Sequence, residues 1–520
     1  MSRWFLFCFC WLLVSQTCSA EKFRKVRGVS LGGWLVVEAW IKHSLFDDIP
    51  NGDMLDGTEV QFHSVASHRY ISAEIRGEQN VTVNTTIPGK SETFRIWRVS
   101  ETQFQFRTSG GQFLSCAGEK CSVSAREKAP STNETFIIQR SYSRVHLRTS
   151  NGSFLQTKSP FQLTADYQGT PGWDDNTATF EMFVVSSDYH GEYQLTNGWG
   201  NKAKDVLKTH RDTFVREEDI RFLSKQGINT LRIPVGWWIY KDPNPPAPYV
   251  GGSLAALDKA FKWAQVYDMK CIIDLHAAPG SQNGKETSSS RDGSADWATS
   301  QKYISQTLDV IDFLAARYAK NPTLLGISLL NNPNASLVPL DVLVSYYSKG
   351  YQIVRNYSST TYVIIPQRTG NADPVELIEA NIGSSNLVLE LHFYNRDNLT
   401  GNASVADNIE FVQKKRRAQI QTLNSSNGTL IFIGEWVNLM SVEDASKDDY
   451  LKFGKAQIEV YNEASFGWAY WTLKNQVKRW DFEWNIQNNY LQLGKYLLRI
   501  VLPSFFSSLE AMTTHSVCCR

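Results

Sequence analysis

The stretch EEDIRFLSKQGINTLRIPVGWW, residues 217–238, is typical of a helix followed by a buried strand. We expect a helix over Glu217–Gln226, because Gly227 stands where a glycine commonly ends a helix. The next run, Asn229–Trp238, is rich in β-branched and aromatic residues, which favour strands. Such a unit predicts a parallel sheet that is covered by helices.

The same alternation continues along most of the chain. Further strands are expected at Val26–Val37, Lys270–His276, Leu324–Asn331, Thr361–Gln367, Leu387–Tyr394, Leu430–Trp436 and Phe466–Leu473. Helical patterns lie between them, with Leu308, Ile311, Ala315 and Tyr318 on one helix face and another helix at Asp341–Tyr357. Eight such units predict an α/β fold, a (β/α)₈ TIM barrel. A doubly wound open sheet is the alternative, but no glycine-rich phosphate loop follows the first strand.

A different pattern interrupts the barrel at residues 56–187, where short alternating runs and glycine-rich turns predict an all-β domain. It contains repeats: Thr93–Ile96, Thr135–Ile138 and Thr179–Met182 are similar, and so are Phe106–Leu114 and Leu147–Leu155, with Tyr70–Ile71 as a weaker copy. Three units of about 40 residues favour a closed threefold domain, because closure removes sheet edges. The arrangement resembles a fascin-like β-trefoil.

The predicted order is therefore a signal peptide (1–20), the barrel start with its first strand (21–55), the β-trefoil insertion (56–187), the rest of the barrel (188–500) and a divergent tail (501–520). The signal is indicated by Arg3, a short apolar run and small residues before position 21. Glycosylation is predicted by sequons at Asn80, Asn84, Asn133, Asn151, Asn334, Asn356, Asn398, Asn402, Asn424 and Asn427. Cys116 and Cys121 are close enough for a small-loop disulfide, whereas Cys271 is expected to be a buried thiol.

Charge and composition narrow the partners. The formal net charge is +1, with 53 basic and 52 acidic residues, so no electrostatic binding to nucleic acid or to an anionic membrane is indicated. No segment predicts stable membrane insertion, and no Cys or His spacing predicts a zinc site. Sixteen Trp and 21 Tyr supply flat rings that suit sugars. The sequence makes no prediction of oligomeric state.

Polar and aromatic residues stand at comparable positions near the ends of seven predicted strands. They are Glu38, Arg232, His276, Asn331 with Asn332, His392 with Tyr394, Glu435, and Trp471. In barrels of this kind the chemistry sits at the C-terminal ends of the strands. Burying so many polar groups costs free energy unless they find partners or a ligand, so these residues predict a site.

The segments around these residues resemble glycoside hydrolase family 5. They are GVSLGGWLVVE (28–38), LRIPV (231–235), DLHAAPGSQN (274–283), LHFY (391–394) and IGEW (433–436). The resemblance covers almost the whole chain and is nearest to the exo-β-1,3-glucanase branch, in the plant type with a fascin-like insertion. It implies a secreted retaining β-glycosidase, in the cell wall or apoplast, that needs no cofactor and acts on a β-glucan, oligosaccharide or glucoside.

The resemblance also implies roles for the strand-end residues. Glu435 would be the nucleophile, kept ionised by Arg232 and hydrogen-bonded by Tyr394. Asn331 would bind the sugar 2-hydroxyl. The glycone site would be formed by Glu38 and His276, which bind hydroxyls, and by Trp471, on which the sugar stacks; His392 would orient the carboxylates.

One position departs from the family pattern. The family has Leu-Leu-Asn-Glu-Pro after the fourth strand, and its Glu is the acid/base, whereas this chain has Asn332 at that position in Leu329–Pro333. An amide cannot donate a proton at neutral pH, and acid/base assistance contributes about 10²-fold to 10⁴-fold to the rate. We therefore expect activity on glucosides with good leaving groups, by hydrolysis or transfer. The alternative is a catalytically impaired cell-wall glycan-binding protein.

Overall fold

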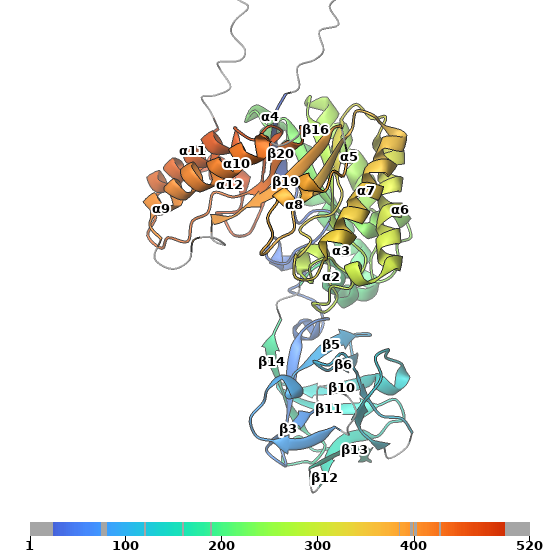
Figure 1. Ribbon diagram of the computed structural model, residues 1–520. Coiled ribbons are helices and arrows are strands. Elements are labelled where there is room, and N and C mark those ends of the chain that lie inside the picture. The colour runs from blue at the N-terminus through green and yellow to red at the C-terminus, as the bar shows by residue number, and fades with distance from the viewer. Residues whose placement is uncertain are drawn as a thin grey trace, which may run out of the picture.

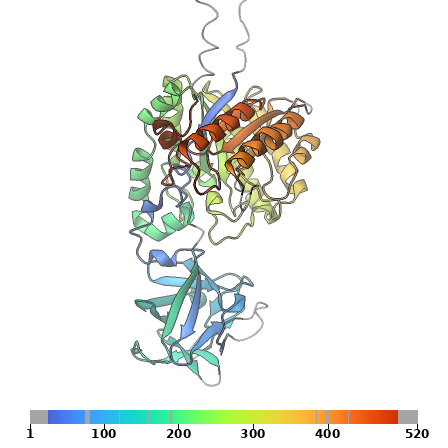
Figure 2. The same ribbon diagram turned by 90° about the vertical axis from the view of Figure 1, so that its left-hand side faces the viewer.

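The computed structural model describes residues 24–73, 81–118, 121–158, 161–187, 190–383, 385–395, 399, 403–425 and 428–493. The predicted signal peptide (1–20) and tail (501–520) lie outside these residues. The described chain forms two bodies, a helix-covered barrel and an all-β domain at one end of it (Figure 1 and Figure 2).

Eight parallel strands close into a barrel in sequence order, which confirms the fold class predicted for the larger domain. They are β1 (Val26–Ser30), β15 (Thr230–Gly236), β16 (Lys270–Ala277), β17 (Leu324–Ser328), β18 (Tyr362–Pro366), β19 (Leu387–Phe393), β20 (Leu430–Trp436) and β21 (Gly467–Tyr470). β1 pairs with both β15 and β21, so the first and last strands meet. Because β2 to β14 form two other sheets, one of 11 strands and one of two (β7 and β9), the all-β domain is inserted after the first barrel strand.

Some strands are shorter than predicted. β1 ends at Ser30 rather than at Val37, and residues 32–37 form turns in which Gly33 has a φ of 74°. An L-residue with a side chain rarely adopts this angle, so the glycine marks the end of the extended run. β17 ends at Ser328, before Asn331, and β21 covers Gly467–Tyr470 instead of Phe466–Leu473. The strand ends that carry the predicted site therefore lie partly in loops.

Helices cover the outside of the barrel (Figure 1). They are α2 (Glu192–Trp199), α3 (Ala203–Thr213), α4 (Glu217–Lys225), α5 (Ser253–Val266), α6 (Gln301–Tyr318), α7 (Leu340–Tyr357), α8 (Val375–Glu379), α9 (Val405–Glu410), the π-helix η10 (Phe411–Arg416), α10 (Arg417–Asn424), α11 (Lys447–Tyr461) and α12 (Phe482–Gln487). The predicted face of α6 packs inward, since Ile311, Ala315 and Tyr318 are buried. α4 ends before Gly227, whose φ is 76°, as predicted.

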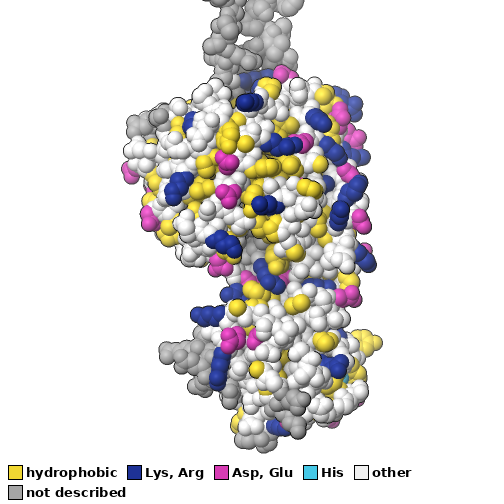
Figure 3. All heavy atoms as spheres, turned by 90° about the vertical axis from the view of Figure 1, so that its right-hand side faces the viewer, with side chains coloured by type: hydrophobic (Ala, Val, Ile, Leu, Met, Phe, Trp, Pro, Cys, Tyr) yellow, Lys and Arg dark blue, Asp and Glu magenta, His cyan; other side chains and the backbone are white. Residues whose placement is uncertain are grey.

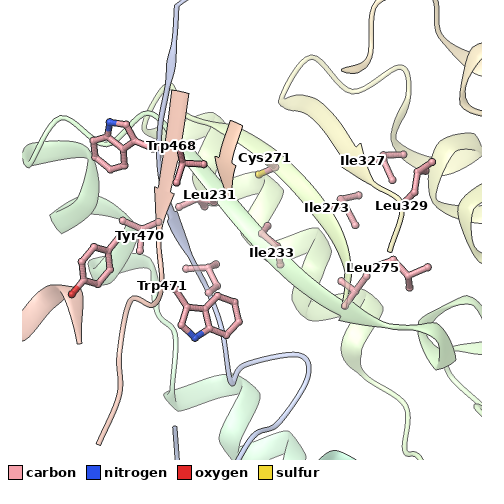
Figure 4. Packing of buried hydrophobic residues seen from close by; sticks show 14 of the residues in the cluster. Leu231, Ile233, Cys271, Ile273, Leu275, Ile327, Leu329, Trp468, Tyr470 and Trp471 are labelled. Carbon is pink, nitrogen blue, oxygen red and sulfur yellow. The ribbon is translucent and has the colours of Figure 1, made fainter. Parts of the chain in front are cut away.

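Side chains alternate between the outside and the inside of the barrel. Outward residues of β15 and β16, among them Leu231 and Ile273 (Figure 4), join the core that the helices cover. Inward residues at the base, such as Ile272 and Phe432, form a separate apolar cluster. One step farther along the strands, the inward residues are instead polar: Arg232, Asp274, Ser328 and Glu390, each 0% exposed. The barrel therefore changes from an apolar plug to an ionic layer towards its C-terminal end.

The inserted domain consists of antiparallel strands. They are β2 (Glu59–Ser64), β3 (Arg69–Ser72), β4 (Thr82–Thr85), β5 (Phe94–Arg98), β6 (Gln103–Arg107), β7 (Leu114–Ser115), β8 (Cys121–Ser122), β9 (Ser124–Ala125), β10 (Phe136–Ser141), β11 (Arg144–Thr149), β12 (Phe154–Lys158), β13 (Gln162–Tyr167) and β14 (Phe180–Ser186). The repeated residues Phe94, Phe136 and Phe180 open three of these strands and lie in one core. The repeats therefore supply equivalent core residues to a single domain.

The described cysteines are arranged as the sequence predicts. Cys116 and Cys121 form a disulfide with a Cα–Cα distance of 5.7 Å, and Cys271 is a buried thiol whose pKa is raised by burial. On the face shown in Figure 3, basic side chains are interspersed with acidic ones over both bodies. Among the helices of the described residues, none combines the length and the apolar character that a bilayer crossing requires.

The two ends of the insertion meet beside the predicted site. Glu38, which follows the first barrel strand, forms an antiparallel bridge with Gly191. The Ala39 N–H donates to the His190 carbonyl at 3.0 Å. The chain that enters the insertion is thus paired with the chain that leaves it, directly at Glu38.

The buried carboxyl group of Glu192 lies at this junction. It is 0% exposed, accepts a hydrogen bond from the Val37 N–H at 3.1 Å, and contacts Arg211 at 3.3 Å. Burial raises the pKa of Glu192 from 4.5 to about 7, although Arg211 and the Val37 N–H oppose the shift. Between pH 4.5 and about 7, the folded chain therefore keeps a proton at Glu192 that the unfolded chain has largely released.

Because only the folded chain keeps this proton at Glu192, we expect the stability of the fold to depend on pH. As pH rises from 4.5 through about 7, the unfolded chain loses the Glu192 proton first, so the folded state becomes less stable by about 3 kcal/mol. Glu192→Gln removes this dependence. We expect its melting temperature, relative to the unsubstituted chain, to increase between pH ~5 and pH ~8. Two parallel profiles in scanning calorimetry would contradict the assignment.

Candidate active site

Arg232 lies at the centre of the predicted site residues. It projects from β15 into the barrel and is 0% exposed. Its Nη2 donates to Asn331 Oδ1 at 3.0 Å, and its Nη1 donates to Glu435 Oε1 at 3.2 Å. A single guanidinium group therefore holds Asn331 and Glu435 side by side, although they follow different strands.

Glu435 faces the barrel interior because the pairing of β20 is irregular. Phe432 points inward, so strict alternation would turn Glu435 outward. The register between β19 and β20 shifts instead, from Leu391↔Ile433 to His392↔Glu435, which leaves Gly434 unpaired. Such a bulge re-aims the next side chain. The carboxylate of Glu435 then accepts a hydrogen bond from the Tyr394 hydroxyl at 2.6 Å.

Two further carboxylates contact Arg232, and the sequence reasoning gave neither of them a role. Glu390 Oε1 accepts from Arg232 Nε at 2.9 Å, and Asp274 Oδ2 lies 3.2 Å from Arg232 Nη1. Each precedes a predicted histidine by two residues, on the same strand face: Glu390 lies 3.2 Å from His392, and Asp274 lies 2.6 Å from His276. An acidic residue within an apolar strand indicates a buried cationic partner, because burying an unpaired charge costs free energy. This pattern at Asp274 and Glu390 could have revealed the contact with Arg232.

The charged groups of this ionic layer shift one another's pKa values. Burial alone would lower the pKa of Arg232, but Asp274, Glu390 and Glu435 raise it above its ordinary value. Burial would likewise raise the pKa of Glu390, yet Arg232, then His392 and Ser328, lower it to about 2. Arg232 and Glu390 thus form an ion pair throughout the physiological pH range.

Glu38 and Trp471 form another side of the site. Glu38 is 0% exposed; its Oε2 accepts from Trp40 Nε1 at 2.8 Å, and its Oε1 lies 3.7 Å from His276 Nε2. Within the described chain Oε1 has no hydrogen-bond partner, which leaves it available to a ligand hydroxyl. Burial, followed by the charge of Glu286, raises the pKa of Glu38 well above 4.5. Its neutral form is favoured, so it can also donate a hydrogen bond.

Aromatic rings surround these polar groups. Trp471 stacks on His276, with ring centroids 5.2 Å apart and an interplanar angle of 4°. Trp480, which the sequence reasoning missed, lies 5.0 Å from Trp40 and 5.5 Å from Tyr394, centroid to centroid. These rings connect the side of the site at Glu38 with the side at Glu435. They form an apolar wall of the kind that sugar rings stack on.

Asn331 and Asn332 complete the site at the end of β17. Asn331 is buried, and its Nδ2 lies 3.3 Å from His276 Nε2. Asn332 has a left-handed φ of 47° and is partly exposed, as are His392 and Tyr394. The site therefore reaches solvent on the side of these three residues. On that side Asn332 presents an amide, where the Leu-Leu-Asn-Glu-Pro pattern has a carboxyl group.

Direct contacts thus bring together Glu38, Arg232, His276, Asn331, His392, Tyr394, Glu435 and Trp471, with Asn332 adjoining Asn331. Among the described residues no cluster of three or more His, Cys, Asp or Glu side chains is suited to a metal ion. The carboxylates pair with arginine, histidine and hydroxyl groups instead. This arrangement suits a polyhydroxylated, uncharged ligand beside one ionisable nucleophile.

Comparison with family models gives two matches. The model of Cellulase (glycosyl hydrolase family 5) matches residues 187–477, and that of a domain of unknown function (DUF7910) matches residues 51–185. The first covers more than half of the chain.

Similar curated proteins include fungal glucan 1,3-beta-glucosidases. The chain is 39% identical to a glucan 1,3-beta-glucosidase of Pichia angusta over 186 residues, 35% of this chain and 42% of that protein. It is 30% identical to glucan 1,3-beta-glucosidase 1 of Schizosaccharomyces pombe over 335 residues, 58% of this chain and 80% of that protein. The match to the Pichia angusta protein therefore spans less than half of its length.

Among solved structures, rutinosidase from Aspergillus niger aligns with a TM-score of 0.51 at 21% identity. The alignment covers 59% of this chain and 90% of that one. At this identity the likeness concerns the barrel fold alone.

Gly434 provides a test of the ionic layer. A Cβ atom at Gly434 would lie 1.9 Å from Glu390 Oε1, so Gly434→Ala must displace Glu390 from Arg232. We expect the free energy of unfolding in urea to fall by about 1 to 3 kcal/mol, or more if the buried ion pair breaks. Gly172→Ala is the control, because nothing lies within 4 Å of its added Cβ and it should change stability by less than about 0.5 kcal/mol. Equal stabilities of the two variants would contradict this packing.

Proposed function

The chain belongs to glycosyl hydrolase family 5, and from this premise we propose that it is a retaining β-glycosidase whose nucleophile is Glu435. The supporting observation is the surroundings of that carboxylate: Tyr394 donates to Oε2 at 2.6 Å and Arg232 to Oε1 at 3.2 Å. Glu435 would attack the anomeric carbon, forming an ester bond as the glycosidic bond breaks. Water or another hydroxyl would then release the sugar and restore the carboxylate.

The proposed donor is a β-linked glucosyl unit in a β-glucan, an oligosaccharide or a glucoside. The names of the fungal relatives support β-glucosyl chemistry. Asn331 is held by Arg232 beside the nucleophile, where it can bind the 2-hydroxyl as charge develops. Glu38 and His276 would bind other sugar hydroxyls, and the sugar ring would stack on Trp471. His392, 3.2 Å from Glu435, would orient the carboxylate.

Asn332 limits the donors that this mechanism can use. The residue at this position protonates the departing oxygen in a retaining mechanism and later activates water. An amide does neither, so cleavage of an ordinary sugar-sugar bond loses about 10²-fold to 10⁴-fold in rate. The proposed enzyme therefore acts on glucosides that leave without protonation, such as acyl or aryl glucosides, by hydrolysis or by transfer.

Asn332 also favours a second candidate function, a catalytically impaired glycan-binding protein of the cell wall. Such a protein would keep the sugar-binding residues Glu38, His276 and Trp471 without turnover. The two candidates differ in whether Glu435 reacts. Both would bind the same class of ligand.

We further propose that the insertion at 56–187 is a fascin-like β-trefoil and that residues 188–500 form the remainder of the barrel. We also propose that the chain is a secreted glycoprotein of the cell wall or apoplast. Three repeated phenylalanines in one core support the trefoil. The disulfide of Cys116 with Cys121 supports an oxidising compartment. Glycosylation is supported by exposed sequon residues: Asn84, Asn133, Asn151, Asn356 and Asn424.

The nucleophile is tested with an aryl β-glucoside in the presence and absence of azide. The chain should release the aryl group slowly, and azide should accelerate turnover and yield β-glucosyl azide, because azide needs no general base. Asn332→Glu should abolish the azide effect and raise turnover of a glucosyl disaccharide by about 10²-fold or more. Glu435→Gln is the control and should be inactive with and without azide.

Binding without turnover separates the two candidate functions. If neither the chain nor Asn332→Glu turns over the aryl glucoside, while both bind a β-glucan oligosaccharide in calorimetry, the glycan-binding function replaces the enzymatic one.

A further inference from the structure

The inserted domain contacts the barrel at Arg291 and Asp292. These residues belong to the β16 loop, which we define as residues 278–296, between β16 and the 3-10 turn at Trp297–Thr299. Asp292 is 1% exposed, and its Oδ2 accepts from Trp97 Nε1 and from Arg107 Nη1, each at 2.7 Å. The Arg291 guanidinium lies 3.7 Å from the centroid of the Trp97 ring. Arg291 Nε also donates to Asp56 Oδ1 of the domain at 2.7 Å, and Arg107 Nη1 donates to Ser294 Oγ of the loop at 2.9 Å. The domain therefore holds the loop by several charge-assisted hydrogen bonds and a cation-π contact.

The residues that make these contacts differ from their counterparts in the other repeats. Trp97 occupies the repeat position that is filled by Gln139 and Phe183. Arg107 corresponds to Arg148, and each donates from Nε to the carbonyl of a glycine four residues later, at 3.4 and 3.0 Å. Arg107 additionally reaches the β16 loop. The threefold pattern is thus broken where the domain meets the barrel.

The β16 loop has a first arm, around Gln282 to Gly284, and a second arm, around Arg291 to Gly293. The first arm contacts the candidate active site. Gln282 Nε2 donates to the carbonyls of His276 and Asn331, at 2.7 and 2.8 Å. Asn283 Nδ2 donates to the carbonyl of Asn332 at 3.1 Å. These side chains of the loop therefore help to hold the backbone of Asn332 in its left-handed conformation, in which φ is 47°.

The two arms of the loop are in direct backbone contact. Gly284 has a φ of 73°, and a Cβ atom added to it would lie 2.6 Å from the Gly293 carbonyl oxygen. Gly293 follows Asp292, and Gly284 follows Asn283. A shift of Asp292 would therefore press on the residue that adjoins Asn283. This contact provides a structural route from the inserted domain to Asn332.

We propose that Trp97 and Arg107 are positioning residues for the aglycone side of the active site, acting through the β16 loop on the backbone of Asn332. The assignment of that side rests on the proposed function, in which the residue at position 332 faces the departing group. The glycone side chains are also fixed from outside the loop, because Asp274 and Trp471 contact the His276 ring and Trp40 donates to Glu38. The inserted domain consequently affects how the leaving group or acceptor is held, and leaves glucosyl binding unchanged.

The test compares Trp97→Phe and Arg107→Lys with the repeat-matched control Arg148→Lys. Trp97→Phe keeps a ring over Arg291 but removes the donor to Asp292, and Arg107→Lys removes the guanidinium group that donates to Asp292 and Ser294. Hydrogen exchange by mass spectrometry follows peptides at 281–294 and 329–336. Steady-state kinetics follow a series of aryl β-glucosides, and calorimetry follows a glucose-configured imino sugar, which has no aglycone.

Both interface variants should exchange faster in both peptides, while Arg148→Lys should not. Their KM for aryl glucosides should rise about tenfold, the effect of losing one hydrogen bond to a charged group, with the imino sugar affinity unchanged. Faster exchange confined to 281–294, or equal effects on imino sugar and aryl glucoside, would overturn the proposal. If the unsubstituted chain binds neither probe, the proposed function fails, and exchange at 329–336 alone decides whether the interface reaches Asn332.

Discussion

A single buried cation, Arg232, determines the arrangement of the barrel towards the C-terminal ends of its strands. Its guanidinium contacts Asp274, Glu390, Glu435 and Asn331, which come from β16, from β19, from β20 and from the loop after β17. A charge in this environment costs several kcal/mol unless it is paired and hydrogen-bonded. The strands must therefore present their carboxylates and amide at one height in the barrel. That requirement aligns the strand ends, and the aligned ends form the site.

The ionic layer holds the surrounding site residues through contacts within the protein. Below it, an apolar plug that includes Ile272 and Phe432 fills the barrel; above it lie Glu38, His276 and Trp471, the residues proposed to bind the sugar. The layer fixes Asn331 and Glu435 from beneath, so their geometry does not depend on the residue at position 332. Replacing a carboxyl group by the amide of Asn332 removes a proton donor but leaves this scaffold in place. The proposed nucleophile Glu435 therefore keeps its contacts with Arg232 and Tyr394 although position 332 carries an amide.

The inserted domain is joined to the site at two places. Its entry and exit segments pair beside Glu38, through the bridge to Gly191, and its surface holds the β16 loop through Asp292. The chain after Glu38 leaves the barrel and returns before the next barrel strand, so the insertion acts as a large loop of the first β/α unit. Loops at this end of a barrel carry specificity. The insertion is accordingly placed to influence substrate choice, although none of its residues belongs to the ionic layer.

The sequence by itself determined the eight strands, the helices between them, the repeated core phenylalanines and the residues near the strand ends, because each of these follows from local periodicity or from a motif. It could not reveal the ionic layer, since the partners of Arg232 are up to 203 residues away in the chain. It could not show that Glu435 points inward, because strict alternation turns that residue outward and only the register shift at Gly434 reverses it. The contact between Asp292 and Trp97 likewise exists only once the two bodies have docked. Tertiary structure decided these features because they depend on distances between strands and domains, which local sequence patterns do not encode.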